Sequence, residues 1–236
     1  MFYPYPSKVA TFTQHEIYND SNTKLFCGHG VKIFIDEVNP IVVFNLQFDQ
    51  KPFSPEEIAS NGFDEDIIEL FEKNKKKHHS RYQNLKELLT DEFFNESLQK
   101  VNVAPVIVAG DLHTPSHLDW TDRAKHFHSN IVYEWPITSI LTQQTALLDT
   151  YRYIHPSEVE EQGITWSTVE MYIDGSNNKI REPQERIDYI FSRGKSLVPI
   201  ESYTYPKSFT ENTLPYVGNN DWPSDHFAVI TVFEWK

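Results

Sequence analysis

The stretch PVIVAGDLHTPSHLDWT, residues 105–121, decides how the chain is expected to fold. Its first five residues form a short apolar run with several β-branched side chains, which predicts a buried strand. This strand delivers Gly110 and Asp111 into a turn, next to His113. Short side chains at a strand edge project from a rigid support, so a metal ion or a proton-transfer group can be held still there. Asp111 is therefore the first candidate for a functional residue.

Two later stretches have the same form, an acidic residue at the edge of an apolar run. ERIDYIF, residues 185–191, places Asp188 inside a strand-like run, and DWPSDHFAVITVFEWK, residues 221–236, places Asp225 and His226 directly before one. Three carboxylates and an imidazole on separate strand ends indicate metal-assisted hydrolysis if the strand ends converge. The spacing alone does not show that they converge. Gly-Asp and Ser-Asp pairs also serve as turn and cap residues that satisfy backbone donors, and this alternative stays open.

Strand and helix signals alternate along the chain, which favours a mixed α/β sandwich in a single domain, residues 1–236. Ser54-Pro55 begins a helix, because a hydroxyl cap precedes a proline at the first helical position. The dense basic run at residues 73–81 is either a solvated helix face or a phosphate-attracting patch, and the polar residues 174–183 predict an exposed loop. Residues 1–30 stay poorly assigned. Predicted strands cover residues 31–35, 41–48, 105–109, 164–166, 186–191, 198–203 and 227–233, and a further helix covers 135–142.

Composition and charge limit the classes of partner. The chain of 236 residues carries 21 basic and 34 acidic residues, a formal net charge of −13. Such a field opposes the approach of long DNA or RNA. The single cysteine, Cys27, excludes an internal disulfide and fits a reducing compartment. No apolar run approaches the ~20 residues that span a bilayer, and the first residues do not form a signal peptide, so a cytoplasmic location is expected.

Four stretches together, GDLHTPSHLDWT, GITWS, ERIDYIF and WPSDHFAV, resemble the endonuclease/exonuclease/phosphatase superfamily of metal-dependent phosphoesterases. They occur in the order of that superfamily, and the Ser-Asp-His and Arg-Ile-Asp-Tyr elements are the most specific. The resemblance implies a four-layer α/β/β/α sandwich of two mainly antiparallel sheets. It also implies hydrolysis of a phosphomonoester or phosphodiester by a water that Mg²⁺ or Mn²⁺ activates. With the acidic balance of the chain, a small phosphoester is a more attractive substrate than long nucleic acid.

The resemblance assigns a role to each motif residue. Asp111 matches the aspartate that lies at the metal-bound water and the scissile phosphate. His226 matches the histidine that acts as a base or stabilises the phosphate, and Asp188 matches the aspartate that orients this histidine. Asp225 matches a neighbouring carboxylate that can bind the metal. Trp166, in the GITWS stretch, is expected to pack in the core rather than to stack on a substrate.

The substrate-binding positions depart from the pattern of the superfamily. The superfamily motif reads Gly-Asp-X-Asn, and His113 stands at the asparagine position. A neutral imidazole offers one donor and one acceptor in a bulkier ring than an amide. The strand that usually ends Asn-X-His-Leu reads Asn45-Leu46-Gln47-Phe48, so Gln47 is an uncharged replacement for a histidine. His113, Gln47, Asn45 and His117 are the candidate substrate-binding residues, although His117 is as easily a residue that caps a turn.

The front of the chain is the largest departure. Residues before Val31 resemble neither the asparagine strand nor the strand with the metal-binding glutamate, so the fold is predicted to be N-terminally truncated relative to the superfamily. The loss of one carboxylate from a hard-ion site cuts affinity severely, and the chain is therefore expected to have reduced or no activity. A catalytically silent member that binds a ligand or a protein partner is the alternative, since missing strands leave a sheet edge for another chain to cover. A structural module without phosphate affinity is the third possibility.

Overall fold

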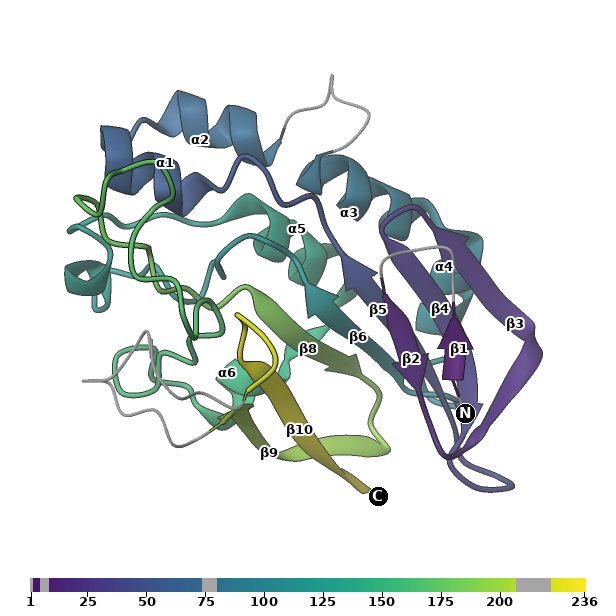
Figure 1. The fold of residues 1–236 in the computed structure, drawn as a ribbon. Helices are drawn as coiled ribbons and strands as arrows, with labels where there is room; N and C mark the ends of the chain where they lie inside the picture. The colour runs from purple at the N-terminus through teal and green to yellow at the C-terminus, as the bar shows by residue number, and fades with distance from the viewer. Residues whose placement is uncertain (1, 5–8, 74–79, 207–221) are drawn as a thin grey trace.

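A computed structural model describes residues 2–4, 9–73, 80–206 and 222–236 (Figure 1). Six strands form its central sheet: β3 (Glu16–Leu25), β4 (Gly28–Phe34), β5 (Pro40–Gln47), β6 (Val106–Asp111), β7 (Leu148–Asp149) and β8 (Asp188–Arg193). Their order is β3-β4-β5-β6-β8-β7. Strands β5 and β6 run parallel, and the other neighbours in this sheet are antiparallel. The sheet is therefore mixed, with the quoted 105–121 stretch supplying a central strand.

Two smaller strand pairs accompany the central sheet. β9 (Leu197–Tyr205) and β10 (Ala228–Trp235) form a second antiparallel sheet, and β1 (Phe2–Pro4) pairs with β2 (Ala10–Phe12). Leu197 and Trp235 of the second sheet pack against an apolar cluster that contains Val31 and Ile33 of the central sheet. The two sheets thus meet face to face, as in a sandwich.

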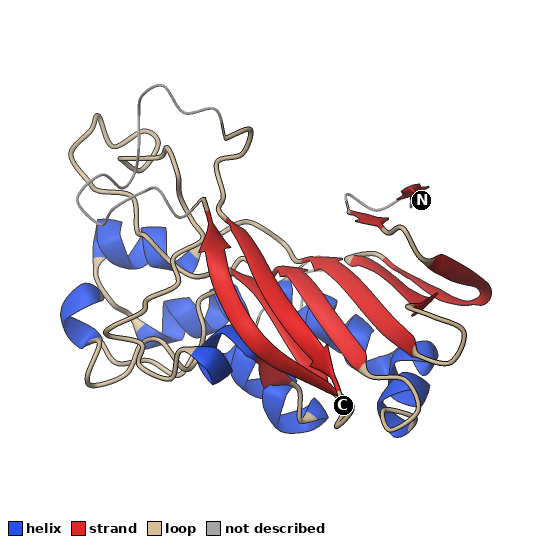
Figure 2. Ribbon diagram, turned by 90° about the horizontal axis from the view of Figure 1, so that it is seen from below, coloured by secondary structure: helices blue, strands red, loops and turns tan. Residues whose placement is uncertain are grey.

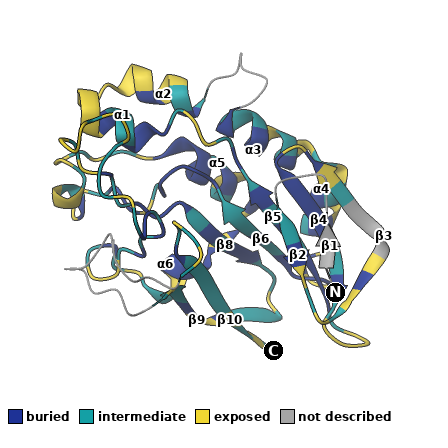
Figure 3. Ribbon diagram, in the orientation of Figure 1, coloured by how far each residue is buried: buried dark blue, intermediate teal, exposed yellow. Residues whose placement is uncertain are grey.

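Helices cover the opposite face of the central sheet (Figure 2). The helices packed there are α3 (Arg81–Thr90), α4 (Glu92–Gln99) and α5 (Pro136–Thr145). α1 (Ser54–Asn61) and α2 (Glu65–Glu72) pack together in a separate apolar cluster with Trp120 and Trp135, α6 (Thr150–Ile154) contacts β8 and β9, and η1 (Lys125–Phe127) is a short 3₁₀ helix. Successive side chains of β5 point to opposite faces of the central sheet and so enter two different apolar clusters. Phe44 and Leu46 pack among α3, α4 and α5, whereas Ile41 and Val43 face the second sheet. The central strands are accordingly the most buried part of the molecule, and β9 and β10 are half-buried (Figure 3).

A buried ion network ties the loop after β6 to the start of β8. Arg186 donates hydrogen bonds to Asp119 (2.9 and 3.1 Å) and to Asp149 (2.8 Å), and Arg152 donates another to Asp119 (2.7 Å). Burial by itself would raise the pKa of Asp119, but the charges of Arg186 and Arg152 hold it below its usual value. Since Arg186 lies two residues before Asp188, the network fixes the loop after β6 beside the strand that carries Asp188.

The predicted fold class, an α/β sandwich of two packed sheets with helices around them, is confirmed. The strand predicted at residues 164–166 is wrong, because only Trp166 makes isolated bridges there, to Glu185 and His226. Residues 1–30, which the sequence left unassigned, contribute β1, β2, β3 and the start of β4. The basic run falls mostly on residues 74–79, outside the described residues. No helix in the described ranges has both the length and the apolar character to cross a membrane.

Candidate active site

Strand register brings the first polar residues of the site into one row. Gln47 at the end of β5 pairs with Asp111 at the end of β6, and Asp111 pairs with Asp188 at the start of β8. Paired residues on neighbouring strands project to the same face of a sheet. The amide and the two carboxylates therefore leave the same edge of the central sheet, on three adjacent strands.

Gly110 makes this row possible. Its φ of 146° lies in the region that favours glycine, and a Cβ at this position would collide with the carbonyl oxygen of Leu46 on β5. The close approach of the two backbones is what lets β5 and β6 stay paired up to Asp111. Gly110 is therefore needed for Asp111 to lie beside Gln47 at the ends of their two strands.

His226 reaches this row from the second sheet, directly before β10. Its Nδ1 donates a hydrogen bond to Asp188 Oδ2 (2.9 Å), and its Nε2 lies 4.0 Å from Asp111 Oδ2. A backbone bridge to Trp166 holds the segment in place, and the two rings lie 4.8 Å apart. One imidazole and two carboxylates from separate strand ends therefore share one position at the edge where the sheets meet.

The charges of the site are strongly coupled. Burial alone would lower the pKa of His226, but the hydrogen bond to Asp188 and the charges of Asp188, Asp111 and Asp225 outweigh it and raise the pKa to about 9. Burial and the charge of Asp111 raise the pKa of Asp188 above its usual range. At neutral pH the metal-free site therefore holds a protonated His226 against two facing carboxyl groups.

His113 binds Asp111 and occupies an unusual backbone conformation. Its backbone N–H donates to Asp111 Oδ1 (2.8 Å), its Nε2 lies 2.8 Å from Asp111 Oδ2, and the residue is 5% exposed. Its φ is 49°, in the left-handed region where asparagine, aspartate and histidine are enriched. Both histidine and the asparagine of the superfamily motif thus suit this backbone position.

We expect His113→Asn to fold with a stability close to that of the unchanged protein, and His113→Ala to lose about 1–2 kcal/mol of unfolding free energy. Alanine carries the steric cost of the left-handed conformation without a side-chain hydrogen bond to offset it. Urea unfolding of the two variants measures the difference. Equal midpoints for alanine and asparagine would show that the backbone conformation at residue 113 does not matter.

Asn45 and His117, two of the predicted substrate-binding residues, make hydrogen bonds to other parts of the chain. Asn45 donates from Nδ2 to the carbonyl oxygen of Ala10 (2.8 Å), and the backbone N–H of His117 donates to Thr138 Oγ1 (2.9 Å) at the start of α5. Both contacts hold the side chains or backbone in place, and the substrate-binding role of Asn45 and His117 stays a prediction.

Gln47 and Asp225 are not part of the cluster that Asp111, Asp188 and His226 form. The Oε1 atom of Gln47 is buried and has no hydrogen-bond partner among the described residues. The exposed Asp225 is not one of the three residues whose ligand atoms cluster, although its charge raises the pKa of His226.

Two residues of the site were missed by sequence reasoning. Trp166, expected in the core, is half-buried and lines a cavity together with His226. Glu182, expected in an exposed loop, is 7% exposed because its Oε1 accepts a hydrogen bond from Trp166 Nε1 (2.7 Å). The two residues lie in separate irregular segments, so no periodic pattern of the sequence links them.

The donor set fits a divalent cation. Asp111, Asp188 and His226 each offer a ligand atom, and these atoms lie within 4.8 Å of one another. Carboxylate oxygens are the ligands that Mg²⁺ and Mn²⁺ prefer, and an imidazole nitrogen suits transition-metal ions. Burial and the neighbouring carboxylate of Asp111 raise the pKa of Asp188, whereas the hydrogen bond from His226 works in the opposite direction, so His226 and His113 offset only part of the negative charge of the pair. A cation would neutralise that charge.

Comparison with known proteins gave one curated relative. An uncharacterized protein of Caenorhabditis elegans, F14F9.5, is 34% identical over 225 residues, which cover 95% of this chain and 69% of that protein. No family model matches the chain.

The solved structures found are more distant. A functionally unknown conserved protein from Enterococcus faecalis has a TM-score of 0.46 at 12% identity, covering 89% of this chain and 56% of that one. An endonuclease/exonuclease/phosphatase from Beutenbergia cavernae has a TM-score of 0.44 at 16% sequence identity, and the match covers 88% of this chain and 39% of that one. A 3′ phosphatase from Neisseria, NExo, bound to a product DNA hairpin, has a TM-score of 0.47 at 17% sequence identity. The match covers 89% of this chain and 65% of that one. The chain thus spans about half the length of the first structures it matches, and the superfamily that the motifs resemble is also named among them.

Proposed function

Given that this chain belongs to the same family as the Caenorhabditis elegans protein, we propose that it hydrolyses a small phosphoester with the help of a divalent cation. One observation carries the proposal: the Nε2 atom of His226 lies 4.0 Å from Asp111 Oδ2, although the two residues come from different sheets. The motifs that resemble the endonuclease/exonuclease/phosphatase superfamily support the same reaction class.

The side chains divide the work of hydrolysis between them. In the proposed step, a water oxygen forms a bond to phosphorus as the bond from phosphorus to the leaving alcohol breaks. Asp111 accepts the proton of the attacking water, and the leaving alkoxide takes a proton from solvent. The Nε2–H of the protonated His226 donates a hydrogen bond to the phosphate, and Asp188 keeps the ring oriented through Nδ1. A divalent cation held by carboxylate oxygens of Asp111 and Asp188 would neutralise phosphate charge and acidify a bound water, and His226 would stay free to donate to the phosphate.

The charge of the protein supports a small substrate over long nucleic acid. The net charge of −13 repels a polyanion, and most of the charged side chains lining the cavity beside His226 are acidic. A small phosphoester brings far less charge, which one cation and the imidazolium of His226 can offset.

The test is an assay with bis(p-nitrophenyl) phosphate and p-nitrophenyl phosphate, each with Mg²⁺ or Mn²⁺ and then with excess EDTA. We expect p-nitrophenolate release that requires the metal ion and returns when metal is restored. Asp188→Asn should lower kcat by about 10- to 100-fold with little change in KM, because Asp188 acts through His226.

The alternative of a catalytically silent member predicts a different outcome. No metal-dependent turnover of either substrate, from a protein that is folded by circular dichroism, would reject the proposed hydrolysis. The hydrogen bond from His113 to Asp111 is the feature of this chain that favours low activity, since it occupies the carboxylate that faces His226.

A further inference from the structure

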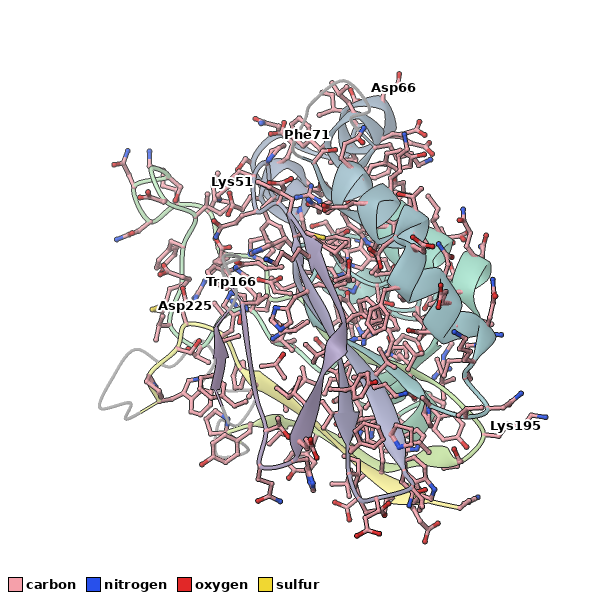
Figure 4. All side chains as sticks on the ribbon, turned by 90° about the vertical axis from the view of Figure 1, so that its right-hand side faces the viewer. Lys51, Asp66, Phe71, Trp166, Lys195 and Asp225 are labelled. Atoms are coloured by element: carbon pink, nitrogen blue, oxygen red, sulfur yellow. The ribbon has the colours of Figure 1, made fainter. Side chains whose placement is uncertain are left out.

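A cavity of about 740 Å³ opens directly beside His113 and His226. Trp166 lines it next to His226, and Lys51 and Phe53 line it from the segment before and at the cap of α1. Figure 4 shows Trp166 close to Asp225, with Lys51 above them. The part of a substrate that is joined to the phosphate would therefore extend into this space, which we name the acidic cavity.

The charged side chains that line the acidic cavity are unbalanced. Glu56, Glu170, Asp174 and Glu182 are acidic, whereas the cationic groups among the lining residues that the structure describes are Lys51 and His226, and His226 is bonded to Asp188. Lys51 is already paired, because its Nζ lies 2.8 Å from Glu56 Oε1. Three carboxylates thus remain without a cationic partner in the lining.

Glu182 is the member that points most directly to a ligand. It is 7% exposed and lines the cavity, yet the hydrogen bond from Trp166 satisfies only one of its carboxylate oxygens among the described residues. Burial raises the pKa of Glu182 to about 6, although the bond from Trp166 works in the opposite direction. A buried carboxylate is costly unless it is paired, so a positive group inside the cavity would relieve that cost.

Aromatic rings complete the lining. The indole of Trp166 contacts both the proposed phosphate site and the acidic lining. Its ring centre lies 4.8 Å from that of the His226 imidazole, and its Nε1–H donates a hydrogen bond to Glu182. Indole faces attract cations, and quaternary ammonium groups are bound in this way by aromatic side chains. Phe53 adds a second ring, whereas Tyr172 is already covered by Arg181, 5.1 Å from its ring centre.

We propose that the acidic cavity binds the cationic part, an amine or a quaternary ammonium group, of a small phosphoester whose phosphate lies at Asp111 and His226. Trp166 and Glu182 contact the cation and thereby select the substrate. This assignment rests on the proposed function, because the phosphate end is the reaction centre described above.

Binding is tested first, without any need for catalysis. Choline is titrated into the full chain and compared with 3,3-dimethyl-1-butanol, which has the same shape without the charge, by calorimetry at pH 7.5. We expect choline to bind at least about tenfold more tightly, from its ion pairing and its contact with the indole. Equal or weaker binding of choline would overturn the assignment, whatever the hydrolysis assay shows.

Variants locate the binding in the cavity. Glu182→Gln keeps an oxygen that can accept from Trp166 Nε1 but removes the charge, and should abolish most of the preference for choline. Glu170→Gln, at an exposed position of the lining, should reduce it less. Glu37→Gln removes one charge in the exposed turn between β4 and β5 and should leave the preference unchanged. A preference that survives Glu182→Gln would place the cation elsewhere and reject the assignment.

Hydrolysis separates this assignment from the proposed function. p-Nitrophenyl phosphorylcholine is compared with 3,3-dimethylbutyl p-nitrophenyl phosphate, and kcat/KM should favour the choline ester by about tenfold. Hydrolysis of both esters at equal rates would reject the cation site and leave the phosphoesterase standing. Selective choline binding without hydrolysis of either ester would support the cavity and reject the phosphoesterase.

The pH dependence of choline binding provides an independent check. The groups that bear on Glu182 are Trp166, Glu56, Lys51 and Glu170. Because the carboxyl of Glu182 loses its charge below its pKa of about 6, choline affinity should fall as the pH drops through that value. Glu182→Gln should remove this dependence, and an affinity that stays constant from pH 7.5 to pH 5 would count against the role of Glu182.

Discussion

His226→Ala is expected to lower kcat/KM for bis(p-nitrophenyl) phosphate by about 10²- to 10⁴-fold, the usual contribution of a positioned acid–base group. The variant removes the donor to the phosphate and leaves Asp188 and Asp111 facing each other without the imidazole between them. Steady-state kinetics with saturating Mn²⁺ measures the effect. His126→Ala, which removes an exposed imidazole, is the matched control and should keep full activity.

The same variant tests the protonation state of the metal-free site. The pKa of His226 is raised from its ordinary 6.5 to about 9 in the folded protein, so its contribution to stability is complete below pH 6.5 and is lost as the pH rises through about 9. Urea unfolding in EDTA should show stability falling between pH 6.5 and pH 9 in the unchanged protein, and a flatter profile for His226→Ala.

Phosphodiesterase activity that survives in His226→Ala would place the reaction centre elsewhere.

Arg186→Met is expected to destabilise the protein by about 3–5 kcal/mol, the usual effect of removing one partner from a buried ion network. Arg186 is 3% exposed and bonds to both Asp119 and Asp149. Its loss leaves two carboxylates buried with Arg152 alone to balance them. Thermal and urea unfolding provide the measurement. Arg123→Met is the control, because Arg123 is exposed and its nearest carboxylate, that of Glu158, lies 3.8 Å away.

An Arg186→Met protein with an unfolding midpoint close to that of Arg123→Met would contradict this reading of the network. If the variant folds, its activity is informative as well. The network fixes the loop after β6 beside β8, so a shifted loop should move Asp111 and Asp188 relative to each other and lower kcat.

The sequence was informative where local pattern and strand position coincide. Apolar runs before Asp111 and around Asp188 predicted strands β6 and β8, because burial on both faces produces a continuous apolar segment. It was uninformative for β3, whose polar stretch Glu16–Leu25 forms a strand only through its pairing with β4. The roles that the resemblance gives to Asp111, Asp188, Asp225 and His226 stay predictions, and so do the cytoplasmic location and the reduced activity.

The amino-acid sequence by itself determined the α/β class and the three motifs that hold Asp111, Asp188 and His226, since periodicity and strand-end chemistry are local properties. The tertiary structure alone decided that Nε2 of His226 lies 4.0 Å from Oδ2 of Asp111, and that Glu182 is buried and accepts a hydrogen bond from Trp166. Both contacts join segments far apart in the chain, and their distances follow from sheet packing and burial, which no local pattern encodes.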